Sequence, residues 1–165
     1  MKVFLINSAP GVGKTSLVNQ LHSTIKEDFA FFDGDDVGKI VPYKLNRRWL
    51  NLIQDNLVCC AANCFKYNIY NVIISFVFPT KERIERIKNK LIDHGFDVVH
   101  IALFCEKEEL LRRLKERNNQ KIVDIESGVK YNELIKELDV DYLIDTTKLS
   151  KKEVANEILK IVNDI

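Results

Sequence analysis

The sequence lacks the features that direct a chain to a membrane or to nucleic acid. No run of apolar residues approaches the twenty needed to span a bilayer, and the first apolar stretch, Val3 to Ile6, is too short for a signal peptide. Lys and Arg total 25 against 24 Asp and Glu, so net charge favours neither nucleic acid nor an anionic membrane as partner. We expect a cytoplasmic protein whose substrate is a small molecule.

Cysteine is scarce and lacks metal-ligand spacing. The four cysteines are Cys59, Cys60, Cys64 and Cys105. They form no C-x-x-C pair, and no His lies close to the first three. This spacing argues against zinc and favours buried, reduced thiols. The three histidines are scattered, and we expect them at the surface or at helix ends: His22, His94 and His100.

Strand and helix patterns alternate along all 165 residues. Apolar, β-rich runs recur at 2–7, 29–32, 70–78, 97–104 and 140–144. Helical spacing fills the intervals at 14–26, 49–60, 84–92, 108–117, 128–138 and 151–162, the last with Ser150 as N-cap. This alternation predicts a single α/β domain over residues 1–165, in which a parallel sheet carries helices on both faces and ligands bind beyond the carboxyl ends of the strands.

A phosphate-binding loop is predicted directly after the first apolar run, where residues 7–16 read NSAPGVGKTS. A strand that ends in a glycine-rich turn and restarts as a helix points its backbone N–H groups into one concavity, and the helix N-terminus adds a positive dipole. The pattern G-x-x-x-x-G-K-[ST] has Ser8 at its first position and matches at its last three. Lys14 should reach the outer phosphates and Thr15 should ligate Mg²⁺. The residues expected to bind the nucleotide here are Gly11, Val12, Gly13, Lys14, Thr15 and Ser16.

Three carboxylates follow the second apolar run, in the segment DGDDVG at 33–38. In this topology that position lies beside the γ-phosphate, so a carboxylate can orient an acceptor hydroxyl, take its proton or hold the hydration shell of Mg²⁺. Asp35 is our first choice for the residue that acts on the acceptor hydroxyl, and Asp33 is a second residue expected on the acceptor side. The alternative is a solvated acidic turn that only caps the next element.

These motifs, in this order, resemble the small P-loop kinases of metabolites: gluconate kinase, shikimate kinase, adenylylsulfate kinase and chloramphenicol phosphotransferase. The segment 33–37 resembles the acidic segment that contacts the acceptor in gluconate and adenylylsulfate kinases. NRRWL at 46–50 resembles the Arg-x-x-Trp-Leu region of gluconate kinase, which implies that Arg47 or Arg48 faces a negative group of the acceptor. Without the family, an Arg pair beside Trp is more often a solvated helix start.

Two further segments resemble the nucleotide side of the same kinases. Arg113 and Arg117 are four residues apart and share a helical face; in these kinases one such Arg packs near adenine and the other reaches the transferring phosphate. A planar, permanently charged guanidinium suits both roles, whereas we expect Arg112 on an exposed face. Residues 140–147, followed by a helix start, are similar to the last strand and the adenine-side loop, which implies nucleotide contact at Thr146.

The resemblance implies a three-layer P-loop NTPase domain, with a five-stranded parallel sheet of the nucleoside-kinase type and a short lid near 118–127. It implies transfer of the γ-phosphoryl group of ATP, with Mg²⁺, to a hydroxyl of a small molecule, with Lys14, Asp35 and Arg117 as catalytic residues. One departure is that the third apolar run, at 72–78, ends without the Asp of a Walker B strand. Magnesium would then rely on Thr15, the phosphates, water and Asp33 or Asp35.

Two other functions compete with a kinase. A GTPase-like switch would use the D-x-x-G match at 35–38, but no Asn-Lys-x-Asp follows and the match comes too soon after Lys14 to leave room for a first switch. A regulatory module that binds nucleotide and turns it over slowly would suit Ser8 and the missing Walker B Asp. The oligomeric state cannot be read from the sequence.

Overall fold

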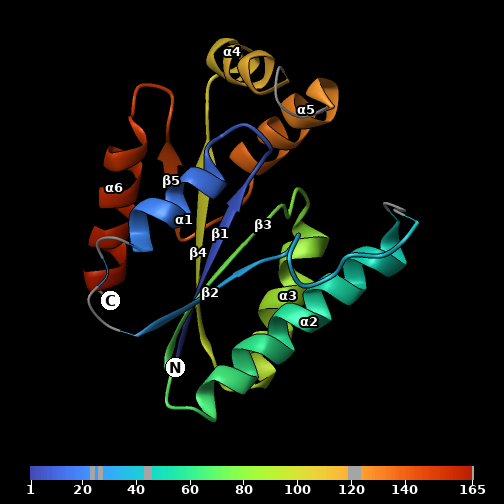
Figure 1. Ribbon diagram of the computed structural model, residues 1–165, viewed down its shortest axis with the longest axis vertical. Coiled ribbons are helices and arrows are strands. Elements are labelled where there is room, and N and C mark those ends of the chain that lie inside the picture. The colour runs from blue at the N-terminus through green and yellow to red at the C-terminus, as the bar shows by residue number, and fades with distance from the viewer. Residues whose placement is uncertain (23–24, 26–27, 43–45, 119–123, 165) are drawn as a thin grey trace.

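The computed structural model of the protein describes residues 1–22, 25, 28–42, 46–118 and 124–164 (Figure 1). Strands and helices alternate as predicted, and the chain has an α/β fold. The strands are β1 (Lys2–Ser8), β2 (Phe29–Asp33), β3 (Asn71–Phe76), β4 (Asp97–Phe104) and β5 (Tyr142–Asp145). The helices are α1 (Lys14–His22), α2 (Arg47–Phe65), α3 (Lys81–Asp93), α4 (Lys107–Asn118), α5 (Ile125–Lys136) and α6 (Lys151–Asp164).

Within the described residues the strands form one parallel sheet of five, in the order β2-β3-β1-β4-β5. β1 lies in the middle, so the loop that follows it emerges at the centre of the carboxyl edge. β2 pairs with β3 in a register that sets Asp33 opposite Ser75. The carboxyl ends of all strands meet at this edge, which is where ligands bind in sheets of this kind.

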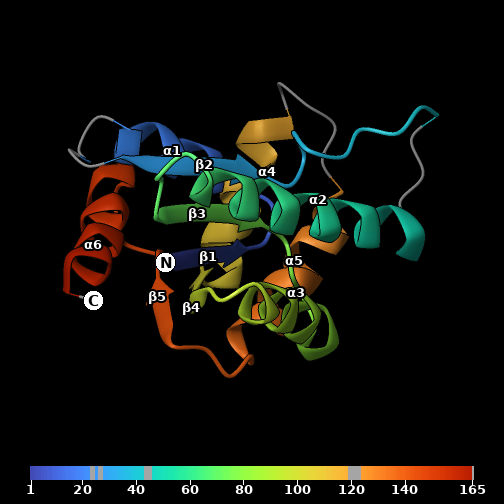
Figure 2. The same ribbon diagram turned by 90° about the horizontal axis from the view of Figure 1, so that it is seen from below.

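The apolar side chains of β1 alternate between two cores, one on each face of the sheet. Val3 and Leu5 pack with residues of α2 and α3, whereas Phe4 and Ile6 pack with residues of α1, α4, α5 and α6. Figures 1 and 2 show α1 with α6 on one side of the sheet and α2 with α3 on the other. The result is the predicted three-layer arrangement, and it explains why β1 is a continuous apolar run.

Helix caps explain where α6 and α5 begin. The start of α6 was predicted correctly, whereas the start of α5 was predicted a few residues too late. Ser150 and Glu153 form a capping box at the start of α6, because each backbone N–H donates to the side chain of the other residue. α5 begins at Ile125 rather than at 128 because the Asp124 side chain accepts from the Ser127 N–H and caps the helix. Of the predicted lid at 118–127, residues 119–123 lie outside the described residues, and the residues after Asp124 are the first turn of α5.

Two expectations about single residues are wrong. Cys59 is exposed on α2 rather than buried, although Cys105 is buried and all four cysteines are free thiols. His100 is fully buried in β4 rather than at the surface. None of the described helices combines the length and the apolar character needed to cross a bilayer.

The buried imidazole of His100 belongs to a small polar network around Asn7. The Asn7 amide pairs with both backbone groups of Phe78: Oδ1 accepts from its N–H and Nδ2 donates to its carbonyl, each at 2.9 Å. The Asn7 Nδ2 also faces His100 Nε2 at 3.3 Å, so this nitrogen accepts and the imidazole is neutral. Burial, and secondarily the positive charge of Lys88, lowers the pKa of His100 from 6.5 to about 4.

We predict that this histidine makes the fold sensitive to acid. Its pKa is lower in the folded than in the unfolded state, so the unfolded state binds the extra proton more readily and the free energy of unfolding falls as the pH drops from 6.5 toward 4. The loss should be on the order of 3 kcal/mol. Urea unfolding across this range should show a steeper pH dependence for wild type than for His100→Gln. The exposed control His94→Gln should keep the wild-type slope, and equal slopes for wild type and His100→Gln would contradict the assignment.

Candidate nucleotide and acceptor site

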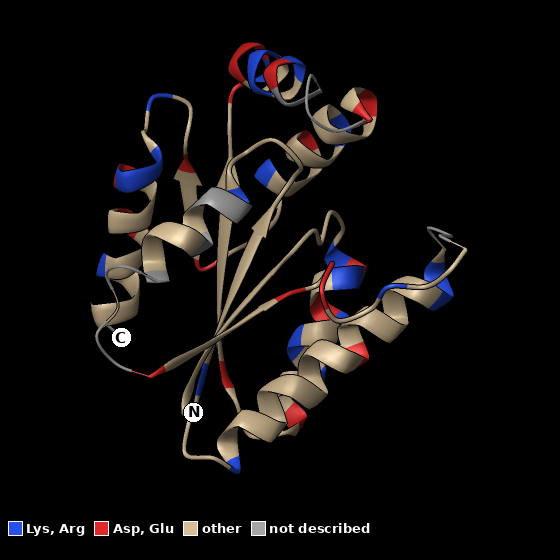
Figure 3. Cartoon of the chain, viewed as in Figure 1, with Lys and Arg blue, Asp and Glu red and all other residues tan. Residues whose placement is uncertain are grey.

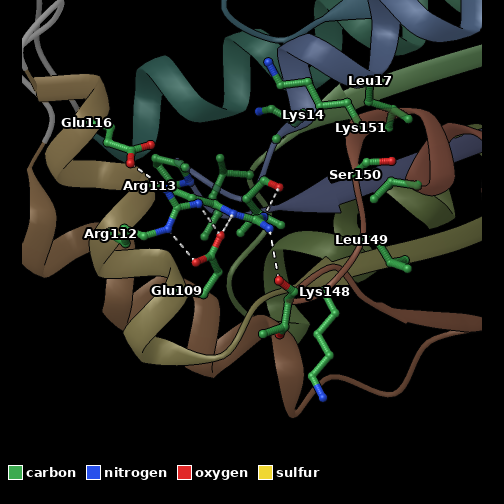
Figure 4. Close-up of a pocket in the computed structure, with 18 of the residues that line it drawn as sticks. Lys14, Leu17, Glu109, Arg112, Arg113, Glu116, Lys148, Leu149, Ser150 and Lys151 are labelled. Atoms are coloured by element: carbon green, nitrogen blue, oxygen red, sulfur yellow. Dashed lines mark hydrogen bonds and ion pairs between the residues drawn. The ribbon is translucent and has the colours of Figure 1, made fainter.

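A cavity of about 790 Å³ lies beyond the carboxyl ends of the central strands. Its wall comes from five places that are distant in the sequence. These are the loop after β1 with the start of α1, the end of β2 with the turn after it, Val77 after β3, α4 between Glu109 and Glu116, and the segment between β5 and α6 with the start of α6. Figure 4 shows the α4 residues on one side of this cavity and Lys148 to Ser150 on the other. The sequence predicted a ligand site at this edge, and the structure has a cavity of ligand size there.

The loop after β1 has the strand, turn and helix geometry of a phosphate-binding loop. Gly11 and Gly13 have φ values of 90° and 122°, which only glycine adopts readily. A Cβ on Gly11 would also lie 2.7 Å from the side chain of Leu114 on α4. Residues 9–14 line the cavity, and α1 begins at Lys14. Backbone N–H groups at a helix N-terminus therefore border the cavity, which is the arrangement that binds phosphate.

Lys14 lines the cavity and lies over the aromatic ring of Phe76, with its Nζ atom 5.8 Å from the ring centre. Phe76 ends β3, at the level where a Walker B strand would carry a carboxylate. The side chains of Thr15 and Ser16 lie outside what the structure describes, and their roles remain predictions. Ser8, at the first position of the motif, is buried, and its hydroxyl has no hydrogen-bond partner among the described residues.

The acidic turn after β2 is held against the end of β3. The Asp36 N–H donates to the Asp33 carbonyl, and the Asp35 N–H donates to the Asp33 carboxylate at 2.9 Å. The Gly34 N–H donates to the Ser75 carbonyl, and a Cβ on Gly34 would lie only 2.1 Å from the ring of Phe76. Figure 3 shows the acidic positions at the end of β2 and in the turn beyond it.

This turn brings two of its three carboxylates to the cavity. Asp33 and Asp35 line it, whereas Asp36 is exposed and does not border the cavity that the described residues form. Asp33 is already engaged, because it also lies 3.5 Å from the Ser75 hydroxyl. Asp35 is exposed, which leaves its carboxylate accessible to a ligand.

Hydrogen bonds of Arg113 link α4, the loop after β1 and the loop after β5. Its Nε donates to Glu109 at 2.8 Å, Nη1 donates to the Val12 carbonyl and the Thr146 hydroxyl, and Nη2 donates to the carbonyls of Thr146 and Thr147. These five hydrogen bonds equal the five N–H groups of a guanidinium. Only the planar faces of Arg113 remain for a ligand, and such a face suits stacking on a nucleobase rather than binding a phosphate.

Thr146 lies beneath the loop rather than at its surface. The residue is fully buried, and its hydroxyl donates to the Phe104 carbonyl while accepting from Arg113. The residues of this loop that line the cavity are the next five, Thr147 to Lys151. A nucleotide role for Thr146 remains a prediction, and in the structure Thr146 holds Arg113.

Of the other two arginines of α4, Arg112 has the exposed side chain that the sequence predicts. Arg112 lines the cavity, and its guanidinium is paired with both Glu109 and Glu116, so it is more than a freely solvated residue. The side chain of Arg117 lies outside what the structure describes, and its catalytic role remains a prediction. Hydrogen bonds from Arg112 and Arg113 lower the pKa of Glu109 from 4.5 to about 2, so this carboxylate is ionised at neutral pH.

The structure does not bring Arg47 and Arg48 to this cavity. Arg47 is highly exposed and pairs with Glu82 at 2.6 Å, beside a second cavity of about 220 Å³ between α2 and α3. Arg48 is also exposed. Asn46 caps α2 by accepting from the Trp49 N–H, which explains why these arginines form the first turn of a helix. Their assignment to the acceptor remains a prediction.

The sequence matches the family model of the chloramphenicol phosphotransferase-like proteins over residues 1–163. The chain belongs to this family. No curated protein matches it. The resemblance to small P-loop kinases is thereby confirmed, and shikimate kinase is among the solved structures that share the fold.

Three further solved structures match almost the whole chain at low sequence identity. The tunicamycin resistance protein of Deinococcus radiodurans is 23% identical, with a TM-score of 0.72 and coverage of 98% of this chain and 95% of that one. A gluconokinase from Sinorhizobium meliloti is 12% identical, with a TM-score of 0.69 and coverage of 99% and 92%. The APS kinase of Mycobacterium tuberculosis, in complex with AMPPNP and APS, is 16% identical, with a TM-score of 0.68 and coverage of 98% and 97%. At these identities the likeness shows the shared fold.

The donor set at the cavity fits the Mg²⁺ that phosphoryl transfer in this family implies. Mg²⁺ prefers oxygen ligands and retains several waters, so a hydroxyl and one or two carboxylates are sufficient. Asp33 and Asp35 supply carboxylates at the cavity, and α1 carries Thr15 in its first turn. The register places Asp33 opposite Ser75, next to the strand end that lacks an acidic residue.

Several cavity residues of this family member were missed by sequence reasoning. Glu109 is the most important of them. The sequence could have identified it, because it precedes Arg113 by four residues on a helix, which is the spacing of an ion pair. Val77 carries no motif, and only the fold brings it to the cavity.

We predict that Gly34 is required for the packing of the acidic turn. Gly34→Ala should lower the free energy of unfolding by about 1–3 kcal/mol, because the new methyl group overlaps the Phe76 ring. Urea unfolding measures this loss. Adding Phe76→Leu, which removes ring atoms from the overlap, should restore part of it. An alanine variant as stable as wild type would contradict the described contact.

Proposed function

We propose that this protein transfers the γ-phosphoryl group of ATP to a hydroxyl group of a small molecule. The observation that carries the proposal is that a phosphate-binding loop and the carboxylate of Asp35 line the same cavity. The family membership supports a phosphotransferase. The cavity therefore combines a place for the phosphates with a group that can act on the acceptor.

The loop and Lys14 would hold the phosphates and offset their charge. The backbone N–H groups at the start of α1 supply a positive dipole, and the ammonium of Lys14 adds a full charge. The Phe76 ring under Lys14 restricts where the ammonium can lie. In phosphoryl transfer this positioning and electrostatic stabilisation supply most of the catalysis.

Asp35 would orient the acceptor hydroxyl and take its proton as the oxygen attacks the γ-phosphorus. The bond that breaks joins the γ-phosphorus to the oxygen that leaves with ADP. Asp33 is less suited to this role, because it already contacts the Asp35 N–H and the Ser75 hydroxyl. Thr15 and Asp33 would hold Mg²⁺, which supplies charge neutralisation for the phosphates.

The base would lie between the face of Arg113 and the segment after β5. Arg113 donates all its N–H groups to the protein, so discrimination between bases would come from the backbone of 147–149. The sequence has no Asn-Lys-x-Asp motif for recognition of guanine after the acidic turn. We therefore propose a modest preference for ATP over GTP. Arg117 would neutralise charge on the transferring group.

The comparisons, rather than the cavity, support our proposal for the class of acceptor. The family is described as chloramphenicol phosphotransferase-like, and one of the solved structures with this fold is a tunicamycin resistance protein. We therefore propose alcohols of antibiotic or nucleoside type as the first compounds to test. A regulatory NTPase is the second candidate, favoured by one observation, namely that β3 ends in Ser75 and Phe76 without a carboxylate.

We predict that Asp35 and Asp36 differ sharply in their importance. Asp35→Asn keeps the shape but removes the charge that accepts a proton, so kcat for acceptor phosphorylation should fall on the order of 10²- to 10⁴-fold. ATP affinity should change little. Asp36→Asn is the matched control and should be near wild type, since Asp36 does not line the described cavity. A larger loss from Asp36→Asn, or equal activity of all three proteins, would overturn the assignment of Asp35.

A further inference from the structure

One carboxylate fixes two arginines at the wall of the nucleotide cavity. The Glu109 Oε1 atom accepts from Arg113 Nε at 2.8 Å and from Arg112 Nη2 at 2.7 Å. Its Oε2 atom accepts from Arg112 Nε at 2.7 Å. Figure 4 shows Glu109 between these arginines. Its side chain is 22% exposed, so solvent screens these ion pairs less than at an open surface.

Glu109 acts on distant parts of the cavity through Arg113. With Nε bound to Glu109, the fork of Arg113 reaches Val12 in the phosphate loop at 3.2 Å and the Thr146 carbonyl at 2.9 Å. A guanidinium is rigid and planar, so fixing Nε also fixes the direction of the other four N–H groups. Three of the segments in the cavity wall, namely α4, the phosphate loop and the β5–α6 segment, therefore depend on the orientation of this one side chain.

We propose that Glu109 is a positioning residue for the nucleotide, which sets the distance between the phosphate loop and the β5–α6 segment by orienting Arg113. The inference rests on the proposed function, because it takes the cavity to be the ATP site. Glu109 itself does not need to touch the nucleotide. Its carboxylate would repel the phosphates if the two arginines did not offset it.

Because Glu109 is negatively charged, the direction in which Glu109→Gln changes ATP affinity tests the proposal. If Glu109 were only a negative charge near the phosphates, Glu109→Gln would strengthen ATP binding. If it positions Arg113, the same variant weakens ATP binding, because a neutral amide oxygen holds the two guanidinium groups less strongly than a carboxylate does. The NH₂ group of Gln would also oppose the Arg112 Nε donor. We expect Kd for ATP to rise roughly 5- to 20-fold, around the low end of the range for complete loss of a hydrogen bond to a charged group, because the amide oxygen still accepts.

The binding experiment measures ATP affinity by calorimetry for wild type, Glu109→Gln and Glu108→Gln. Glu108 is the matched control, since it lies in the same acidic first turn of α4 but is exposed and does not line the described cavity. It reports the effect of removing a negative charge near this helix end, and we expect it near wild type. Unchanged or tighter binding by Glu109→Gln would overturn the proposal.

A double-mutant cycle with Arg113→Lys shows whether Glu109 works through Arg113. Lysine keeps the charge but loses the planar fork, so each single variant should weaken ATP binding. If Glu109 acts by orienting Arg113, the double variant should be no weaker than Arg113→Lys alone. Additive losses would show that Glu109 acts by another route and would overturn the proposal.

Amide hydrogen exchange without nucleotide separates this proposal from the proposed function. In Glu109→Gln the amides of 11–14 and 147–151 should exchange faster than in wild type, whereas those of β1 and β4 should not change. Unchanged exchange at both segments overturns the positioning role whether or not ATP binds. If wild type fails to bind ATP but the exchange result holds, the proposed function fails and the linkage through Glu109 stands.

Discussion

Burial of β1 on both faces is the constraint on which the rest of the structure depends. Val3 and Leu5 face one core, and Phe4 and Ile6 face the other, with each side chain nearly inaccessible to water. Each of these side chains contributes about 2 kcal/mol through burial. A strand buried on both faces must lie in the interior of the sheet, and the loop that follows it must emerge at the centre of the carboxyl edge. The phosphate-binding loop is therefore positioned by the core and not by its own residues.

The parallel direction of the sheet then brings the acidic turn to the same edge. β2 lies two positions from β1, with β3 between them, and β3 supplies the Ser75 and Phe76 contacts that hold the turn. The same Phe76 ring packs against Lys14. The end of β3 thus contacts both Lys14, at the end of the loop after β1, and the acidic turn after β2.

Much of the fold could be predicted because its signals are local. The phosphate loop, the alternation of strands and helices and the Ser150 cap each arise from neighbouring residues with known conformational preferences. The strand order and the cavity wall could not be predicted, because they depend on contacts between distant segments. The pairing of Arg47 with Glu82, which is 35 positions away, is one such contact.

His100 and Glu109 show the two ways in which a single sequence misleads. His100 looked exposed because its spacing suggested no metal site, yet it is fully buried, and Asn7 on the neighbouring strand faces its Nε2 atom. The sequence places Glu109 four residues before Arg113, and only the folded chain shows which backbone carbonyls Arg113 reaches while it is bound to Glu109.

The most direct test of the central claim is to follow labelled γ-phosphate from ATP in the presence of Mg²⁺, with and without a panel of antibiotic, nucleoside and sugar-acid alcohols. The account predicts that label moves to the hydroxyl of at least one of these compounds and that ADP forms faster when that compound is present. If inorganic phosphate is the only labelled product and no compound changes its rate of formation, the account is contradicted and the protein is a nucleotide-binding NTPase rather than a kinase.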